Sequence, residues 1–288
     1  MNPALALVIS CRPRQWIKNG LVLIPLVSSA SFRSGDAVRR SLMAAVAFSL
    51  ISSAVYLLND LTDRAHDRAH PLKKLRPIAA GWLSPEVAVA AAVLLAGGAL
   101  WIAAWLHGKV LLVLSFYALC NLGYSLGLRA QPILDVLLVS AGFVMRPVAG
   151  AWAIPVRVSS WLFVVSMLMA LSLALLKRRA ELVGLDQTAV GHRPALGGYS
   201  IRFLDQLISM TTGAGIISYA LYTFQSEHSE TLVATLPVFL YGVFRYLYLV
   251  YERDAGGSPE DIFLRDRPLQ VAALLYLAAV IAILTSRY

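Results

Sequence analysis

The sequence predicts an all-α integral membrane protein with nine transmembrane helices. Hydrophobic residues make up 58% of its 288 residues, and charged residues only 14%. Soluble domains contain about 45–50% apolar and about 25% charged residues, so a soluble fold would lack polar side chains to cover its surface. The apolar residues also form separate stretches of about 20 residues, the length of a membrane-spanning helix. We therefore expect residues 1–288 to form a single membrane domain.

The expected spans follow one another with loops between them. The first is short and contains Pro25, which weakens its boundaries, and the fifth contains Arg146 and Pro147, which indicate a kink or a break. The nine spans are expected over residues 17–32, 41–59, 86–106, 109–127, 133–153, 160–176, 207–225, 231–250 and 268–286.

The formal net charge of +9 lies in the loops between these spans. We interpret it as a signal for membrane orientation and anionic ligands, and expect no nucleic acid partner. With the N-terminus in the cytoplasm, most lysines and arginines fall on the inner side, as the positive-inside rule requires. Acidic residues concentrate on the same side although orientation does not require them. The two signs together suggest a cytoplasmic site that holds a metal and an anion.

The strongest candidate site lies at the end of the second expected span. Asn59, Asp63 and Asp67 are spaced by four residues, which places them on one face of a helix, and Asp60 lies beside them. Carboxylates this close repel one another unless a cation lies among them. Oxygen ligands alone favour Mg²⁺ or Mn²⁺ over zinc, and Mg²⁺ leaves coordination positions for a diphosphate. Asn59, Asp60 and Asp63 are therefore the expected metal ligands.

Basic side chains follow this motif and recur further along the chain. Lys73, Lys74 and Arg76 could clamp a diphosphate. The alternative is a solvated loop whose acids cap helices and pair with its bases. A second basic run, Lys177–Glu181, ends the sixth span. It could bind an anion of the site or, alternatively, anchor the helix at the membrane surface.

Four more charged residues lie in or beside the spans. A charged side chain such as Arg146 costs several kcal/mol in lipid, so it is expected to face a cavity or a partner. An ion pair with Asp135 and contact with a ligand both remain open for it. Lys18 begins the first span and either anchors it or points inward, and Asp266 is expected to cap the ninth span and form an ion pair.

The N-D-x-x-D-x-x-x-D run resembles the UbiA-type intramembrane prenyltransferase superfamily, and the resemblance covers essentially the whole chain. That superfamily carries a second D-x-x-x-D run after the sixth span, where this chain has the basic run Lys177–Glu181. The basic run and several other segments are similar to the decaprenyl-phosphate phosphoribosyltransferase branch. These segments are Arg12–Asn19, Asp67–Pro77, Gly142–Arg146 and Asp266–Leu269. The resemblance implies a UbiA-like arrangement of nine helices around a central cavity.

The branch implies transfer of 5-phosphoribose from phosphoribosyl diphosphate (PRPP) to a polyprenyl, decaprenyl-like phosphate, with Mg²⁺ as cofactor and diphosphate released. Asn59 and Asp63 would bind Mg²⁺. Asp60 would be either a further ligand or a residue that contacts the ligands and not the metal ion. Asp60, Asp63 and Lys73 would be catalytic. The implied substrate-binding residues are Lys18, Tyr56, Lys73, Arg76, Arg129, Arg146, Lys177 and Arg178.

In this interpretation Tyr56 contacts the sugar donor, and Lys18 and Lys73 bind its phosphates. The last four cations of that set would receive the lipid phosphate or the ribose 5-phosphate, in an order left open. The enzyme would lie in the bilayer of the bacterial cytoplasmic membrane with its site facing the cytoplasm. A homo-oligomer is left open.

Two other functions compete. A conventional prenyltransferase of the same fold, moving a prenyl group from its diphosphate to an aromatic acceptor, predicts the second acidic run that this chain lacks. A membrane transporter predicts discontinuous helices with charged residues near the midplane of paired halves, and only Arg146 fits that pattern.

Overall fold

The computed structural model describes residues 2–71, 73–157, 159–184, 194–225, 229–253 and 259–285. Within these ranges every regular element is a helix, which confirms the all-α prediction. Eight helices in the described part of the chain are long and apolar enough to cross a membrane. The chain forms two compact units, which we describe one at a time.

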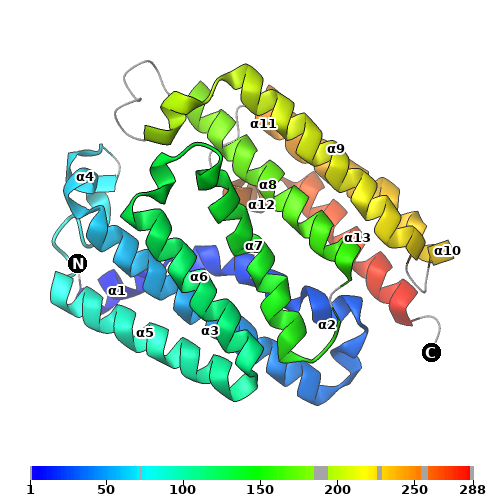
Figure 1. The fold of residues 1–288 in the computed structure, drawn as a ribbon, viewed down its shortest axis with the longest axis horizontal. Helices are drawn as coiled ribbons and strands as arrows, with labels where there is room; N and C mark the ends of the chain where they lie inside the picture. The colour runs from blue at the N-terminus through cyan, green and yellow to red at the C-terminus, as the bar shows by residue number, and fades with distance from the viewer. Residues whose placement is uncertain are drawn as a thin grey trace. The chain divides into compact units, whose positions relative to one another are not determined.

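The first unit comprises Met1–Leu26, Phe32–Gly127 and Met145–Val156. Its central helix, α3, packs against η1, α5 and α6 (Figure 1). The buried face of α3 is built from small side chains such as Ala44, Ala47 and Ala54, which allow close helix packing in a membrane. The elements of this unit are α1 (Pro3–Ser10), η1 (Pro13–Leu23), α3 (Gly35–Thr62), α4 (Arg64–Ala69), η3 (Lys73–Leu75), α5 (Pro85–Leu106) and α6 (Gly108–Leu126).

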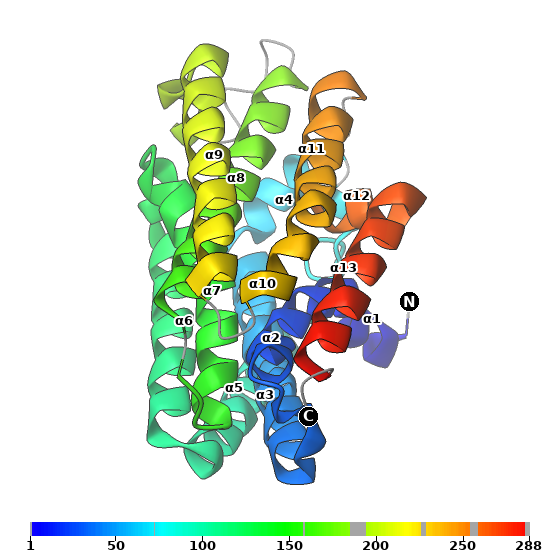
Figure 2. The same cartoon turned by 90° about the vertical axis from the view of Figure 1, so that its right-hand side faces the viewer.

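The second unit comprises Val27–Ser31, Leu128–Val144 and Arg157–Tyr288. Helices α8 and α9 lie side by side, and α11 packs against α13 (Figure 2). The elements of this unit are η4 (Leu128–Ala130), α8 (Ser160–Val183), η6 (Pro194–Gly198), α9 (Ile201–Gln225), α10 (Ser229–Leu232), η7 (Val233–Thr235), α11 (Leu236–Glu252), α12 (Pro259–Arg265) and α13 (Arg267–Thr285). Helix α7 (Leu134–Ala153) contributes its first residues to this unit and its last ones to the first.

Asp266 holds two helices of the second unit together, as the sequence predicted in outline. Its Oδ1 accepts the backbone N–H of Leu269 at 2.8 Å, which caps α13. Its Oδ2 accepts Nη2 of Arg245 from α11 at 2.8 Å. The hydrogen bond from Arg245 is the main cause that lowers the pKa of Asp266, so the pair stays charged at neutral pH.

The first expected span, residues 17–32, is not one α-helix. The 3₁₀ helix η1 runs to Leu23 and is followed directly by α2 (Ile24–Ser28). Pro25 explains the difference, because it has no N–H to donate to Leu21 and its ring would clash with that carbonyl in an α-helix. Eleven residues of 3₁₀ helix and five of α-helix still give a path of about 30 Å, the thickness of the hydrocarbon core. The segment is long enough to cross the membrane.

Gly150 marks the closest approach of η1 to α7 within the first unit. A Cβ atom at this position would lie 1.9 Å from the carbonyl oxygen of Val22. The missing side chain therefore lets the backbone of η1 pack directly on the second part of α7.

Replacing Gly150 with alanine should destabilise the protein by about 1–3 kcal/mol, the typical cost of overpacking a well-packed core. Gly97→Ala is the matched control, because nothing lies within 4 Å of a Cβ there and alanine favours the helix over glycine. Thermal unfolding in detergent should show a lower Tm for Gly150→Ala alone. An equal Tm for the two variants would contradict the packing described.

Candidate active site

The acidic motif lies where α3 ends and α4 begins. Asp63 ends α3 with φ −88° and ψ 0°, so the single helical face predicted for the motif is interrupted there. The spacing nevertheless continues through the junction. The N–H of Asp63 donates to the carbonyl of Asn59 at 2.9 Å, and the N–H of Asp67 donates to the carbonyl of Asp63 at 2.8 Å.

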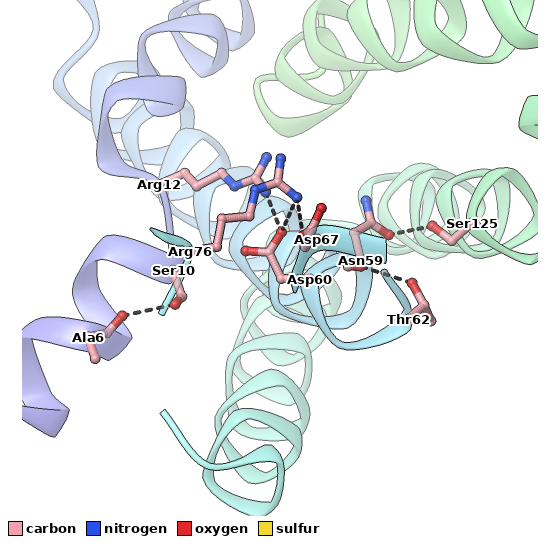
Figure 3. Close-up of polar contacts among 9 residues, drawn as sticks. All are labelled: Ala6, Ser10, Arg12, Asn59, Asp60, Thr62, Asp67, Arg76 and Ser125. Carbon is pink, nitrogen blue, oxygen red and sulfur yellow. Dashed lines mark hydrogen bonds and ion pairs between the residues drawn. The ribbon is translucent and has the colours of Figure 1, made fainter. Parts of the chain in front are cut away.

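Asp60 is the most deeply buried carboxylate of this motif, at 2% exposure. Its Oδ1 accepts hydrogen bonds from Nη2 of Arg12 and, at 3.1 Å, from Nη1 of Arg76 (Figure 3). The same Nη1 of Arg76 donates to Oδ2 of Asp67 at 2.7 Å. Two arginines and two carboxylates thus form one charge-balanced network, because a buried carboxylate is costly unless it is paired and hydrogen-bonded.

Asn59 and Tyr56 extend this network on the same helix. The amide oxygen of Asn59 accepts a hydrogen bond from the hydroxyl of Ser125 on α6 (Figure 3). The guanidinium of Arg12 stacks 4.8 Å from the ring centre of Tyr56, a favourable cation–π geometry. Arg12 therefore touches two of the predicted site residues, although the sequence placed it only in a segment similar to the phosphoribosyltransferase branch and gave it no role in the site.

The donor set at this junction suits a hard divalent cation. Asn59 and Asp63 offer an amide oxygen and a carboxylate and are partly exposed, whereas Asp60 faces arginines. In the described residues no three His, Cys, Asp or Glu side chains group as a metal site. Mg²⁺ accepts one or two protein oxygens with water and phosphate completing its shell, so these two residues fit it.

Two lysines that the sequence predicted to bind the phosphates of the sugar donor lie on neighbouring segments of the same unit. Lys18 of η1 is half-buried, and its Nζ donates to Gln15 at 2.6 Å. Lys73 has an exposed side chain, and its backbone N–H donates to Nδ1 of His70 at 3.3 Å. That bond fixes the start of the loop that carries Lys73 and Arg76.

Arg146 is a buried part of the first unit at 4% exposure. Its Nε donates to the amide oxygen of Asn19 at 2.8 Å, and its guanidinium lies 5.0 Å from the ring centre of Phe48. The ion pair with Asp135 that the sequence left open is not formed. Asp135 lies eleven residues earlier in α7, a rise of about 16 Å.

Asp135 instead binds Arg178 within the second unit. The carboxylate is fully buried, and its Oδ2 accepts Nε of Arg178 at 2.6 Å. Its Oδ1 accepts the hydroxyl of Tyr199 at 2.7 Å. Nη1 of Arg178 donates to Glu181 at 2.8 Å, so two carboxylates already surround this guanidinium.

Tyr199 is a protonated donor in this cluster. Burial, followed by the hydrogen bond to Asp135, raises the pKa of Tyr199 to about 12. The phenol therefore keeps its proton at neutral pH and donates a hydrogen bond to the carboxylate. Nothing in the sequence pointed to Tyr199, which follows two glycines in a segment between helices.

Arg179 of the basic run is also bonded to a carboxylate, whereas the two other predicted cations, Lys177 and Arg129, are described by their exposure. Arg179 donates from Nε to Asp205 at 2.6 Å and stacks 4.0 Å from the ring centre of Tyr251. Lys177 and, before α7, Arg129 are half-buried. The arginines of the run are thus engaged with carboxylates of their own unit.

Curated relatives cover nearly the whole chain. The chain is 34% identical to a decaprenyl-phosphate phosphoribosyltransferase from Mycolicibacterium smegmatis, over 97% of this chain and 92% of that protein. It is 35% identical to the protein of the same name from Mycobacterium tuberculosis, over 97% and 94% of the two chains.

Solved structures share the fold. A UbiA homolog from Archaeoglobus fulgidus, bound to DMAPP and Mg²⁺, superposes with a TM-score of 0.75 at 18% identity over 99% of both chains. The model of the UbiA prenyltransferase family matches residues 22–264. With this match across most of its length, the chain belongs to the UbiA prenyltransferase family.

Proposed function

We propose that this protein transfers 5-phosphoribose from PRPP to a polyprenyl phosphate at the cytoplasmic face of the inner membrane. The observation that carries the proposal is the basic sequence at the end of α8. A conventional prenyltransferase of this family would offer carboxylates there for a second metal ion, whereas this chain has Lys177, Arg178 and Arg179. The one acid of the run, Glu181, binds Arg178 at 2.8 Å. Relatives named as phosphoribosyltransferases over nearly the full length support the same function.

The first unit binds PRPP in this proposal. Asn59 and Asp63 would hold Mg²⁺ on the diphosphate. Asp60 supports these two residues without touching the metal ion, because its carboxylate is bonded to Arg12 and Arg76. Tyr56 contacts the donor. Lys18, Lys73 and Arg76, which the sequence predicted to bind substrate, bind its phosphates, since charge-assisted hydrogen bonds to phosphate are the strong ones.

The second unit binds the lipid phosphate. Of the cations predicted for this anion, Arg129 and Lys177 of this unit are half-buried, and Arg178 is buried and bonded to Asp135. Arg146 belongs to the first unit, where it is buried and bonded to Asn19. We assign direct contact with the anion to the half-buried pair.

The chemistry is a displacement at C1 of the ribose. The bond from C1 to the diphosphate oxygen breaks, and an oxygen of the lipid phosphate forms the new bond to C1. Bound Mg²⁺ would neutralise negative charge on the diphosphate. Lys73 stabilises the charge that develops on the departing oxygen. The lipid phosphate is already an anion and needs no strong base, so the protein acts mainly by positioning two anions that repel each other.

The direct test is transfer of label from ribose-labelled PRPP. Purified protein with polyprenyl phosphate and Mg²⁺ should move the label into an organic-soluble lipid, and a chelator of divalent cations should stop the transfer. Prenyl diphosphate with an aromatic acceptor should give no product. Absence of labelled lipid, or prenylation of the aromatic acceptor, would overturn the proposal.

Asp63→Asn should reduce transfer by about 10²–10³-fold, because it replaces an anionic oxygen ligand with a neutral amide oxygen that binds Mg²⁺ more weakly on the leaving diphosphate. Asp36→Asn is the matched control. Asp36 lies on the same helix but is exposed and pairs with Arg39 at 2.6 Å. Initial rates over a range of Mg²⁺ concentrations check this. Equal rates for the two variants would exclude Asp63 as a metal ligand.

A further inference from the structure

Asp135 joins three segments of the second unit that are distant in the sequence. It lies in the first turn of α7 and accepts hydrogen bonds from two other segments. One comes from Arg178 in the last turns of α8, and the other from Tyr199, which directly follows η6. We propose that Asp135 and Tyr199 are positioning residues for the lipid-phosphate cations Arg129 and Lys177, and that Arg178 acts as a tie between them. This inference rests on the proposed function.

The backbone before α7 supports the assignment. Ile133 has φ +68°, a left-handed conformation that is unfavourable for a β-branched residue. Its N–H donates to the Tyr199 oxygen at 2.5 Å. Such strain persists only where the surroundings hold the residue in place. Tyr199 supplies such contacts, because it is bonded to both Ile133 and Asp135.

The ring of Pro132 packs closely against Gly198, which brings the same segments together. A Cβ atom on Gly198 would lie 2.4 Å from Cγ of Pro132, and η4 contacts η6. Arg129 belongs to η4, so its backbone is held against η6 by this contact and by the bond of Tyr199. One cation of the proposed lipid site is thereby fixed.

The second cation is fixed through its neighbour. Lys177 precedes Arg178 on α8, and the bond to Asp135 sets the rotation of the helix and thus the direction in which Lys177 projects. Arg178 itself is 3% exposed, with N–H groups on Asp135 and Glu181. Because of these bonds, we assign Arg178 the role of holding the cluster together, and we assign contact with the lipid phosphate to Lys177.

The energetics favour a positioning role. A buried ion pair adds little stability compared with apolar packing of the same volume, because desolvation offsets the attraction. The pair at Asp135 is buried on both sides, at 0% and 3% side-chain exposure. Its value lies in fixing three segments at one point next to two phosphate-binding cations.

The experiment compares Tyr199→Phe, which removes only a hydroxyl, with the stronger variant Asp135→Asn. The control is Asp266→Asn, which also breaks an interhelical Asp–Arg pair of this unit. We expect KM for polyprenyl phosphate to rise about tenfold in Tyr199→Phe and more in Asp135→Asn, with KM for PRPP unchanged within about twofold. The control should lower Tm without changing either KM.

A double mutant separates positioning from general stability. If Tyr199 acts through the neighbouring cations, its effect on the lipid KM should shrink in a Lys177→Ala background. Additive effects, equal rises of both KM values, or a loss of Tm alone would overturn the inference.

Failure of the proposed function gives a different result. In that case the wild-type protein itself transfers no phosphoribose. The inference is then tested by binding of polyprenyl phosphate in micelles, where about tenfold weaker binding by Tyr199→Phe supports it and equal binding overturns it.

Discussion

Asp60 and Asp135 are almost fully buried near the ends of apolar helices, and arginine side chains hold each of these carboxylates. An unpaired charge in such a place costs several kcal/mol, so each carboxylate requires a cation from a distant segment. Asp60 thereby ties η1 and the loop after η3 to α3. Asp135 ties α8 and the segment after η6 to α7. Each attachment joins segments that carry other site residues of its unit.

The same pairing divides the many cations of the chain into two groups. Arg12, Arg178 and Arg179 are bonded to carboxylates of their own units, and Arg146 is bonded to Asn19. Our proposal assigns substrate anions to Lys18, Lys73, Lys177, the half-buried Arg129 and Arg76. Arg76 belongs to both groups, because it bonds Asp60 and Asp67 while 29% of its side chain remains exposed. The total of 25 lysines and arginines is therefore not a measure of anion-binding capacity, because several of these cations compensate carboxylates or fix helices.

The sequence predicted the fold well because apolar stretches of spanning length are a strong signal. It did not predict the form of the first span, where a 3₁₀ helix precedes Pro25 and only a short α-helix follows. The acidic motif was visible because its residues are local in sequence. Asp135 and Arg178 are 43 residues apart, and no spacing rule connects them. Tyr199 and Arg12 were missed for the same reason, since their roles depend on which distant carboxylate they reach.

The central claim is that Mg²⁺ and the acidic motif serve the sugar donor, while the lipid brings only a phosphate. Equilibrium binding of labelled PRPP, without lipid and with or without Mg²⁺, tests it most directly. PRPP should bind only with Mg²⁺, and binding should be lost in Asp63→Asn but retained in Lys177→Ala. PRPP binding that is independent of Mg²⁺, or that depends on Lys177 and not on Asp63, would contradict the account.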